Sequence, residues 1–205
     1  MEIKKIGFNL IISAPSGAGK STLINKLLRE DDSFALSISA TTRKKRTGEQ
    51  EGVDYYYKSL AEFLELVNND AFLEHEEVFG NWYGTLKKDV DEKLNMGKNI
   101  IFDIDARGAS NIKQKAQENS VLVYILPPSI AELEKRLDKR GTDSKDIISN
   151  RMLQAKVAVQ SAVLYDYIII NDDLDNAYKE LKAIVDSNKI KTNRFVNIKG
   201  ILNNL

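Results

Sequence analysis

The chain has 205 residues, and its 30 lysine and arginine residues balance 30 aspartate and glutamate residues, so the formal net charge is zero. A balanced charge argues against a general binder of nucleic acids or anionic membranes, which would normally carry a basic excess. The absence of cysteine excludes disulfides and thiol catalysis, and a single histidine, His75, excludes a histidine zinc cluster. No apolar run approaches the roughly 20 residues that span a bilayer. We therefore expect a soluble, intracellular globular protein, located in the cytoplasm.

The first predicted element is an apolar strand over residues 8–13, followed by a glycine-rich loop and a helix over residues 22–30. Residues 37–88 then break the pattern. They are rich in Tyr, Thr, Glu and Gly, and they predict an insert of short strands with one helix. Ser59 and Glu62 have the spacing of a capping box and mark the start of that helix.

Three more apolar runs of strand length follow, over residues 99–104, 121–126 and 167–171. Between them, Ser129 and Glu132 predict a helix that ends near Gly141. Another helix is expected over about 143–163, and a last one after Asp173. Strands that are apolar on both faces and alternate with helices predict an α/β fold with a central parallel sheet flanked by helices. The polar tail after about residue 187 has no clear period, and we expect a frayed or helical end.

The glycine-rich loop matches the phosphate-binding pattern G-x-x-x-x-G-K-[ST], except that its first position is Ala14. Its glycines let successive N–H groups turn inward around a phosphate, and the helix N-terminus adds a partial positive charge. Lys20 can then reach the β- and γ-phosphates, and the Ser21 hydroxyl can bind Mg²⁺. Asp103, at the end of a strand, is the candidate carboxylate for the same metal. The residues predicted to bind ATP in this loop are Ala14, Pro15, Ser16, Gly17, Ala18, Gly19, Lys20, Ser21 and Thr22.

A basic segment in the insert predicts a second anion site. Arg43 and Arg46 lie three residues apart, and two planar guanidinium groups can clamp a monophosphate. Tyr83 and the tyrosines at 55–57 offer hydroxyl donors nearby. Charge alone leaves open an ordinary solvated surface loop, which is the commoner role of such a segment.

Seven further segments, in order along the chain, resemble the guanylate kinase family. The segments are TTRKKRTGE at 41–49, GVDYYY at 52–57, AFLEHEEVFGNWYGT at 71–85, FDIDARGA at 102–109, ILPPS at 125–129, RGTDS at 140–144 and IINDDLDNAYKEL at 169–181. The resemblance extends from about residue 9 to about residue 186 and is closest to the bacterial type. It implies a P-loop NTPase core at about 5–36 and 89–187, a GMP-binding insert at about 37–88, a lid at about 136–151 and a C-terminal tail at 188–205.

The resemblance also implies an activity, in which ATP and GMP give ADP and GDP with Mg²⁺ as cofactor. By the family's pattern the GMP phosphate is held by Arg43, Arg46, Tyr55 and Tyr83, and the guanine by Ser39, Glu74, Thr85 and Asp105. Arg136, Arg140 and Arg151 would lie near the transferring phosphates, and the catalytic residues would be Lys20, Arg43, Arg140 and Arg151. Lys45 stands where the family usually has proline, and Arg107 where it usually has glutamine.

The chemistry of guanine agrees with this assignment. Guanine presents two neighbouring donors, N1–H and the N2 amino group, which one carboxylate can accept together, whereas its O6 and N7 are acceptors. Glu74 and Asp105 supply carboxylates, and Ser39 and Thr85 supply hydroxyl donors. The mechanism needs no titrating base, so His75 is expected to be structural or solvent-exposed.

Two other functions remain open. Guanylate-kinase-like domains also occur as non-catalytic modules that bind phosphorylated peptides, although those typically lose the phosphate loop that this chain keeps. A P-loop kinase for another phosphorylated small molecule is the second alternative, and the guanine-binding set speaks against it. We expect ATP and GMP as partners and neither nucleic acid nor membrane, whereas the oligomeric state stays open.

Overall fold

Five parallel strands form the central sheet of the computed structural model, which describes residues 4–78, 80–104, 106–115, 119–139 and 161–196. They are β2 (Asn9–Ser13), β3 (Phe34–Leu36), β8 (Asn99–Asp103), β9 (Ser120–Leu126) and β10 (Tyr167–Ile170). Their spatial order is β10-β9-β2-β8-β3, with β2 in the middle. The chain builds the sheet on one side of β2 before crossing to the other. The carboxyl end of β2 is therefore the topological switch point, where open α/β sheets bind ligands.

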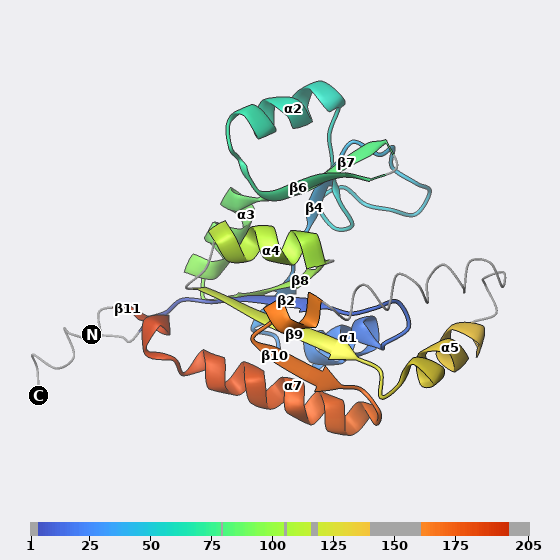
Figure 1. The fold of residues 1–205 in the computed structure, drawn as a ribbon. Helices are drawn as coiled ribbons and strands as arrows, with labels where there is room; N and C mark the ends of the chain where they lie inside the picture. Colours follow the sequence, from blue (N-terminus) through green and yellow to red (C-terminus); the bar gives the residue numbers. More distant parts are fainter. Residues whose placement is uncertain (1–3, 79, 105, 116–118, 140–160, 197–205) are drawn as a thin grey trace, which may run out of the picture.

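Helices cover both faces of this sheet (Figure 1). Leu10 and Ile12 of β2 pack with α1 (Lys20–Glu30) and α7 (Leu174–Lys189), whereas Ile11 packs on the opposite face with α3 (Lys87–Asn95) and α4 (Ala106–Lys115). Successive strand residues point to opposite faces, so a strand covered on both sides must be apolar at nearly every position. The whole of β2 is buried, and the predicted α/β fold with a parallel sheet is confirmed.

The helix starts that the sequence predicted at Ser129 and Asp173 are also confirmed. The backbone N–H of Glu132 donates to the Ser129 hydroxyl at 3.1 Å, at the start of α5 (Ile130–Lys139). Asp173 caps α7 by accepting from the N–H of Asn176. The predicted end of α5 near Gly141 and most of the helix expected over 143–163 lie outside the described residues. No described helix is long and apolar enough to cross a membrane.

Four strands at the periphery differ from the sequence prediction. β3 was missed because three residues are too few to show a period. Ile169 of β10 is buried in the core, but Ile168 and Ile170 are each 50% exposed, so this strand is not buried on both faces as expected. Within the predicted tail, β11 (Phe195–Val196) pairs antiparallel with β1 (Lys4–Lys5), an element that no period in the sequence indicated.

Arg194 packs this segment against the core. Its side chain is 1% exposed, its guanidinium lies 5.0 Å from the Phe8 ring centroid, and Nη1 donates to Asn119 Oδ1 at 2.8 Å. Burial lowers the pKa of this guanidinium. Stacking on an aromatic face compensates in part for lost hydration, since arginine is more weakly hydrated than lysine. Arg194 therefore anchors the described C-terminal end of the chain to the core through Phe8 and Asn119.

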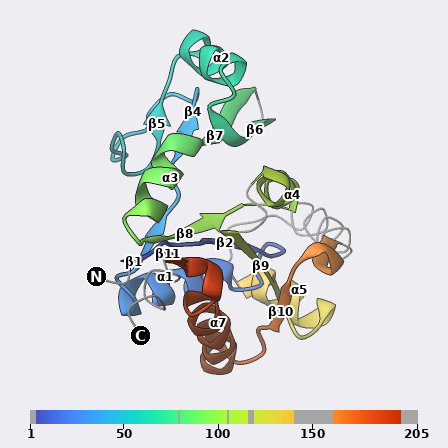
Figure 2. The same ribbon diagram turned by 90° about the vertical axis from the view of Figure 1, so that its left-hand side faces the viewer.

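A second, four-stranded sheet stands over the core and forms a separate body (Figures 1 and 2). Its strands, in spatial order, are β5 (Tyr56–Tyr57), β4 (Ser39–Thr41), β7 (Asn81–Leu86) and β6 (Phe72–Val78). The helix α2 (Leu60–Asn68) covers it and begins with the predicted capping box of Ser59 and Glu62. Phe63 of α2 stacks on Phe72 with ring centroids 4.5 Å apart and forms a small core of its own.

Candidate functional site

The phosphate loop connects β2 to α1 at the switch point of the sheet. Gly17 and Gly19 have φ angles of 92° and 96°, a region that side chains rarely adopt. Among the described non-glycine residues, positive φ occurs at Asp70 alone, so the backbone at Ala14 accepts a side chain without strain. Gly19 immediately precedes α1, and a glycine leaves the first N–H groups of that helix without a side-chain cap. Uncapped N–H groups at a helix N-terminus are suited to bind phosphate.

Asn171 supports this loop from the end of β10, a role that the sequence did not reveal. Its side-chain Nδ2 donates to the carbonyl of Ala18 at 2.7 Å, and a Cβ added at Gly19 would lie only 2.2 Å from the same atom. Its own carbonyl accepts from Nη1 of Arg136 at 3.0 Å. Asn171 thus connects the phosphate loop to α5. The only signal in the sequence was a polar residue directly after an apolar strand.

Lys20 and Asp103 meet at the carboxyl ends of neighbouring strands. The register pairs Asp103 of β8 with Ile12 of β2, and the Lys20 ammonium lies 2.5 Å from Asp103 Oδ1. One carboxylate and one hydroxyl, Asp103 and Ser21, suit Mg²⁺, which usually takes one or two protein ligands and completes its shell with water and substrate phosphates. No cluster of three or more acidic or histidine ligands occurs among the described residues, so a metal bound entirely by protein groups is not indicated there.

Two pockets meet at these residues. The first has a volume of about 370 Å³ and is lined by Ala14, Pro15, Ser16, Gly17, Gly19, Lys20, Ser21, Thr22 and Asp103. The second, of about 270 Å³, is lined by Ser21, Ile24, Asn25, Leu36, Ser37, Ser39, Asp54, Tyr55, Asp103 and Ile104. Ser21 and Asp103 line both pockets. The arrangement can therefore hold two molecules side by side, with Ser21 and Asp103 between them.

The arginine predicted to clamp a phosphate lies in the insert, held by Glu49. Arg43 Nη2 and Nη1 donate to the two carboxylate oxygens at 2.6 and 3.1 Å. This pairing raises the pKa of Arg43 and, with the N–H of Arg46 and the hydroxyl of Tyr57, lowers the pKa of Glu49 to about 2. Burial and Glu49 together raise the pKa of Tyr57 to about 12. All of these groups keep their ordinary charges at neutral pH.

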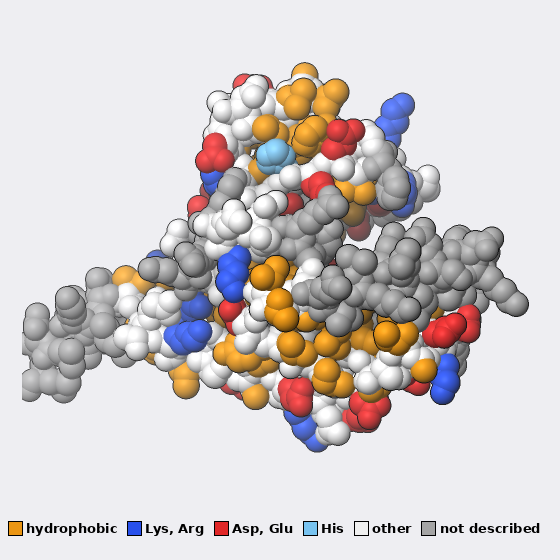
Figure 3. Space-filling model, in the orientation of Figure 1, with side chains coloured by type: hydrophobic (Ala, Val, Ile, Leu, Met, Phe, Trp, Pro, Cys, Tyr) orange, Lys and Arg blue, Asp and Glu red, His pale blue; other side chains and the backbone are white. Residues whose placement is uncertain are grey.

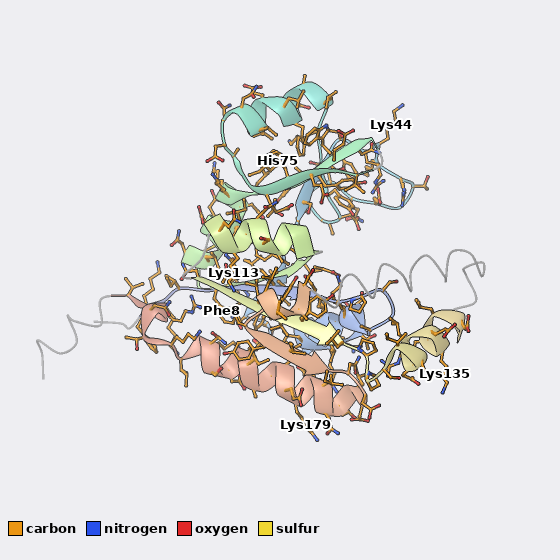
Figure 4. All side chains as sticks on the ribbon, in the orientation of Figure 1. Phe8, Lys44, His75, Lys113, Lys135 and Lys179 are labelled. Carbon is orange, nitrogen blue, oxygen red and sulfur yellow. The ribbon has the colours of Figure 1, made fainter. Side chains whose placement is uncertain are left out.

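Aromatic rings surround this pair. The Arg43 guanidinium lies 5.1 Å from the centroid of the Tyr55 ring, and Tyr55 contacts Tyr83 edge-on at 6.1 Å. Arg43, Tyr55 and Tyr83, which are predicted to bind the GMP phosphate, are therefore close together. The side chain of Arg46 is exposed, and Arg46 joins the cluster through its backbone: its N–H donates to the Glu49 carboxylate and its carbonyl accepts from the Glu49 N–H at 3.2 Å. Lys44, the next residue after Arg43, extends away from the insert into solvent (Figure 4).

The residues predicted to bind guanine lie on adjacent strands of the insert. The Thr85 hydroxyl donates to Glu74 Oε1 at 2.7 Å, and the register places Ser39 beside Thr85. Thr85 is 1% exposed, so its hydroxyl fixes one oxygen of the carboxylate. The other oxygen, Oε2, lies near Gly108 in the first turn of α4, where the helix dipole favours negative charge.

Several predicted residues lie elsewhere or outside the described residues. Asp105, Arg140 and Arg151 fall outside them, as does the predicted lid beyond residue 139. His75 lies between the rings of Phe72 and Trp82 at 5.9 and 5.8 Å, lines neither pocket, and lies next to hydrophobic side chains on the face shown in Figure 3. Its position agrees with a structural role.

A family model, related sequences and a solved structure all match the same protein family. A sequence model described as guanylate kinase matches residues 7–188. The guanylate kinase of Rickettsia felis is 47% identical, over 93% of this chain and 99% of the relative, and that of Zymomonas mobilis is 44% identical, over 97% and 92%. The crystal structure of guanylate kinase from Anaplasma phagocytophilum superposes with a TM-score of 0.74 at 34% identity, covering 98% of this chain and 96% of that one.

Proposed function

This chain belongs to the guanylate kinase family and transfers the γ-phosphoryl group of ATP to GMP, and we propose the residues that carry out the transfer. The observation that supports the assignment most directly is the pair of pockets that share Ser21 and Asp103. Phosphoryl transfer requires a donor and an acceptor in line, and its catalysis is mainly positioning and charge neutralisation. Two adjoining pockets with a common metal position meet that requirement.

The first pocket is the proposed ATP site. The N–H groups of the phosphate loop would surround the β-phosphate, and Lys20 would leave Asp103 to neutralise charge on the transferring group. Ser21 and Asp103 would hold Mg²⁺, which neutralises phosphate charge when bound. Thr22 also lines this pocket. Arg136 of α5 would contribute a further positive charge, and its guanidinium is held by the carbonyl of Asn171. Arg140 and Arg151 are proposed to act on the same phosphates.

The second pocket and the insert are the proposed GMP site. Arg43, Arg46, Tyr55 and Tyr83 would hold the phosphate, and Ser39, Glu74, Thr85 and Asp105 the guanine. An oxygen of the GMP phosphate would attack the γ-phosphorus of ATP while the bond to the β–γ bridging oxygen breaks. The attacking oxygen is already anionic, so no general base is needed. The proposed division into core (5–36 and 89–187), insert (37–88), lid (136–151) and tail (188–205) follows the same scheme.

A turnover assay with GMP, AMP, CMP and UMP as acceptors tests this function. GMP should exceed AMP in kcat/KM by at least about 10³, because a site that hydrogen-bonds a substrate group strongly rejects an analogue lacking it. Lys20→Ala should lower kcat for GMP by about 10²-fold or more through lost charge stabilisation, with the fold intact by circular dichroism. Equal use of all four acceptors would exclude the guanine site, and absence of turnover would favour a binding module.

A further inference from the structure

Glu49 connects three parts of the proposed phosphate site through one carboxylate. Oε1 accepts from Arg43 Nη2 at 2.6 Å, while Oε2 accepts from Arg43 Nη1, from the backbone N–H of Arg46 and from the Tyr57 hydroxyl at 3.1, 2.8 and 2.7 Å. Its side chain is 19% exposed. We infer that Glu49 is the positioning residue of the acceptor-phosphate clamp: it fixes the plane of the Arg43 guanidinium and the loop that carries Arg46. This inference rests on the proposed function.

The geometry leaves part of Arg43 available to a ligand. One Nη1 hydrogen goes to Glu49 and another to the carbonyl of Lys44 at 2.9 Å, and one Nη2 hydrogen goes to Glu49. Arginine has five N–H donors in a rigid fork. Fixing one edge of the fork therefore orients the remaining donors in a known plane, beside the Tyr55 ring and the Tyr83 side chain, which also hydrogen-bonds Arg43. Those tyrosines are the ones proposed to bind the same phosphate.

Preorganisation of this kind has a thermodynamic consequence. A free arginine side chain loses rotamer freedom when it binds a phosphate, and that cost weakens binding. An arginine already held by a carboxylate loses less. The carboxylate is also a negative charge near a phosphate dianion, so repulsion alone would make Glu49 unfavourable for GMP. If positioning dominates, removing the charge of Glu49 should raise KM for GMP. If repulsion dominates, it should lower KM for GMP, so a kinetic measurement can decide between them.

The experiment compares Glu49→Gln with Glu51→Gln in steady-state kinetics on the full chain. Glu51 is a matched control because it lies in the same loop and accepts from the Tyr57 backbone N–H at 3.0 Å. Glu49→Gln should raise KM for GMP by at least about 10-fold, as expected for the loss of charge-assisted hydrogen bonds that position a group. The dissociation constants of ATP and of guanosine, which lacks the phosphate, should stay within about 2-fold, and kcat should fall less than KM rises.

Two further variants separate positioning from a general loss of structure. Tyr57→Phe removes one donor to Glu49 and should raise KM for GMP by about 2- to 10-fold, the range for one hydrogen bond. In an Arg43→Lys background, which loses the planar fork, Glu49→Gln should add little, because residues that act as a unit are non-additive. An unchanged or lowered KM in Glu49→Gln, or weakened guanosine binding, would overturn the inference. Failure of the wild type to phosphorylate GMP would instead overturn the proposed function.

Discussion

At the scale of single residues, the structure shows how one carboxylate can be made selective. Thr85 is buried and donates its hydroxyl proton to one oxygen of Glu74, so that oxygen is satisfied before any ligand arrives. In the proposed guanine site, a carboxylate held in one orientation would present a defined acceptor edge to the N1–H and N2 donors. The sequence supplied both residues, but their hydrogen bond follows from the pairing of β6 with β7.

Glu74→Gln tests this residue. An amide accepts more weakly than a carboxylate and can present a misplaced donor, so kcat/KM for GMP should fall by about 10- to 100-fold. The dissociation constant of ATP should not change, since the proposed ATP and GMP sites are separate pockets. The matched control is Glu77→Gln, an exposed position on the same strand. Intact GMP turnover in Glu74→Gln would remove this residue from the guanine site.

At the scale of elements, the phosphate loop depends on a strand far away in the sequence. Asn171 follows β10 and reaches Ala18 across 153 residues of chain. Two features of the loop require glycine at position 19: its φ of 96° and the 2.2 Å approach of Asn171 to a would-be Cβ. The conformation of the phosphate loop therefore depends on the positive φ of Gly19 and on the contact with Asn171.

Gly19→Ala should therefore abolish measurable ATP binding, because Asn171 must give up its bond to Ala18 or the loop must move to relieve the clash, and the loop backbone must also change to relieve the positive φ. Gly48→Ala is the matched control: its φ is 91° and nothing lies within 4 Å of the added Cβ. That variant should lose only about 1 kcal/mol of unfolding free energy from backbone strain and should keep its ATP affinity. Isothermal titration with an ATP analogue measures the ATP affinity of both variants. Comparable ATP affinity in the two variants would contradict the role of Asn171.

The capping box of α2 predicts a pH dependence. Hydrogen bonds from the hydroxyl and N–H of Ser59 lower the pKa of Glu62 below its ordinary value of 4.5. A depressed pKa in the folded state contributes stability above the unfolded value, and that contribution is lost as the pH falls through the folded value. The difference in unfolding free energy between wild type and Glu62→Gln should be full at pH 7, begin to fall near the unfolded value of about 4.5, and vanish only once the pH is below the depressed folded value. Urea titrations across this range provide the measurement, and a constant difference would exclude the linkage.

At the scale of the whole molecule, the insert meets the core at a second pocket that both contribute to. Ser39, Asp54 and Tyr55 come from the insert, whereas Ser21 and Asp103 come from the core. Arg43 lines neither pocket, although it lies against Tyr55. The insert is joined to the core through the short connections between β3 and β4 and between β7 and α3. If Arg43 holds the acceptor phosphate, as proposed, we expect the insert to move towards the core when the nucleotides bind.

Solution scattering tests this movement. The free chain should have a radius of gyration above the roughly 17 Å expected of a compact domain of this length. Adding GMP together with a non-hydrolysable ATP analogue should reduce it, because closure excludes water from the transferring group. The analogue alone should change it less, since the first pocket is built from the core. Equal radii in the free and doubly liganded states would count against closure.

The sequence by itself determined the parallel sheet, the phosphate loop, most helix starts and the family, because each depends on neighbouring residues or on collinear spacing. Runs apolar on both faces specify covered strands, and the G-K-S triplet after such a strand specifies a phosphate loop. Tertiary structure alone decided that Asn171 supports that loop, that Arg194 is buried on Phe8, and that two pockets share Ser21 and Asp103. These contacts join residues far apart in the chain, and only the folded path of the backbone brings them together.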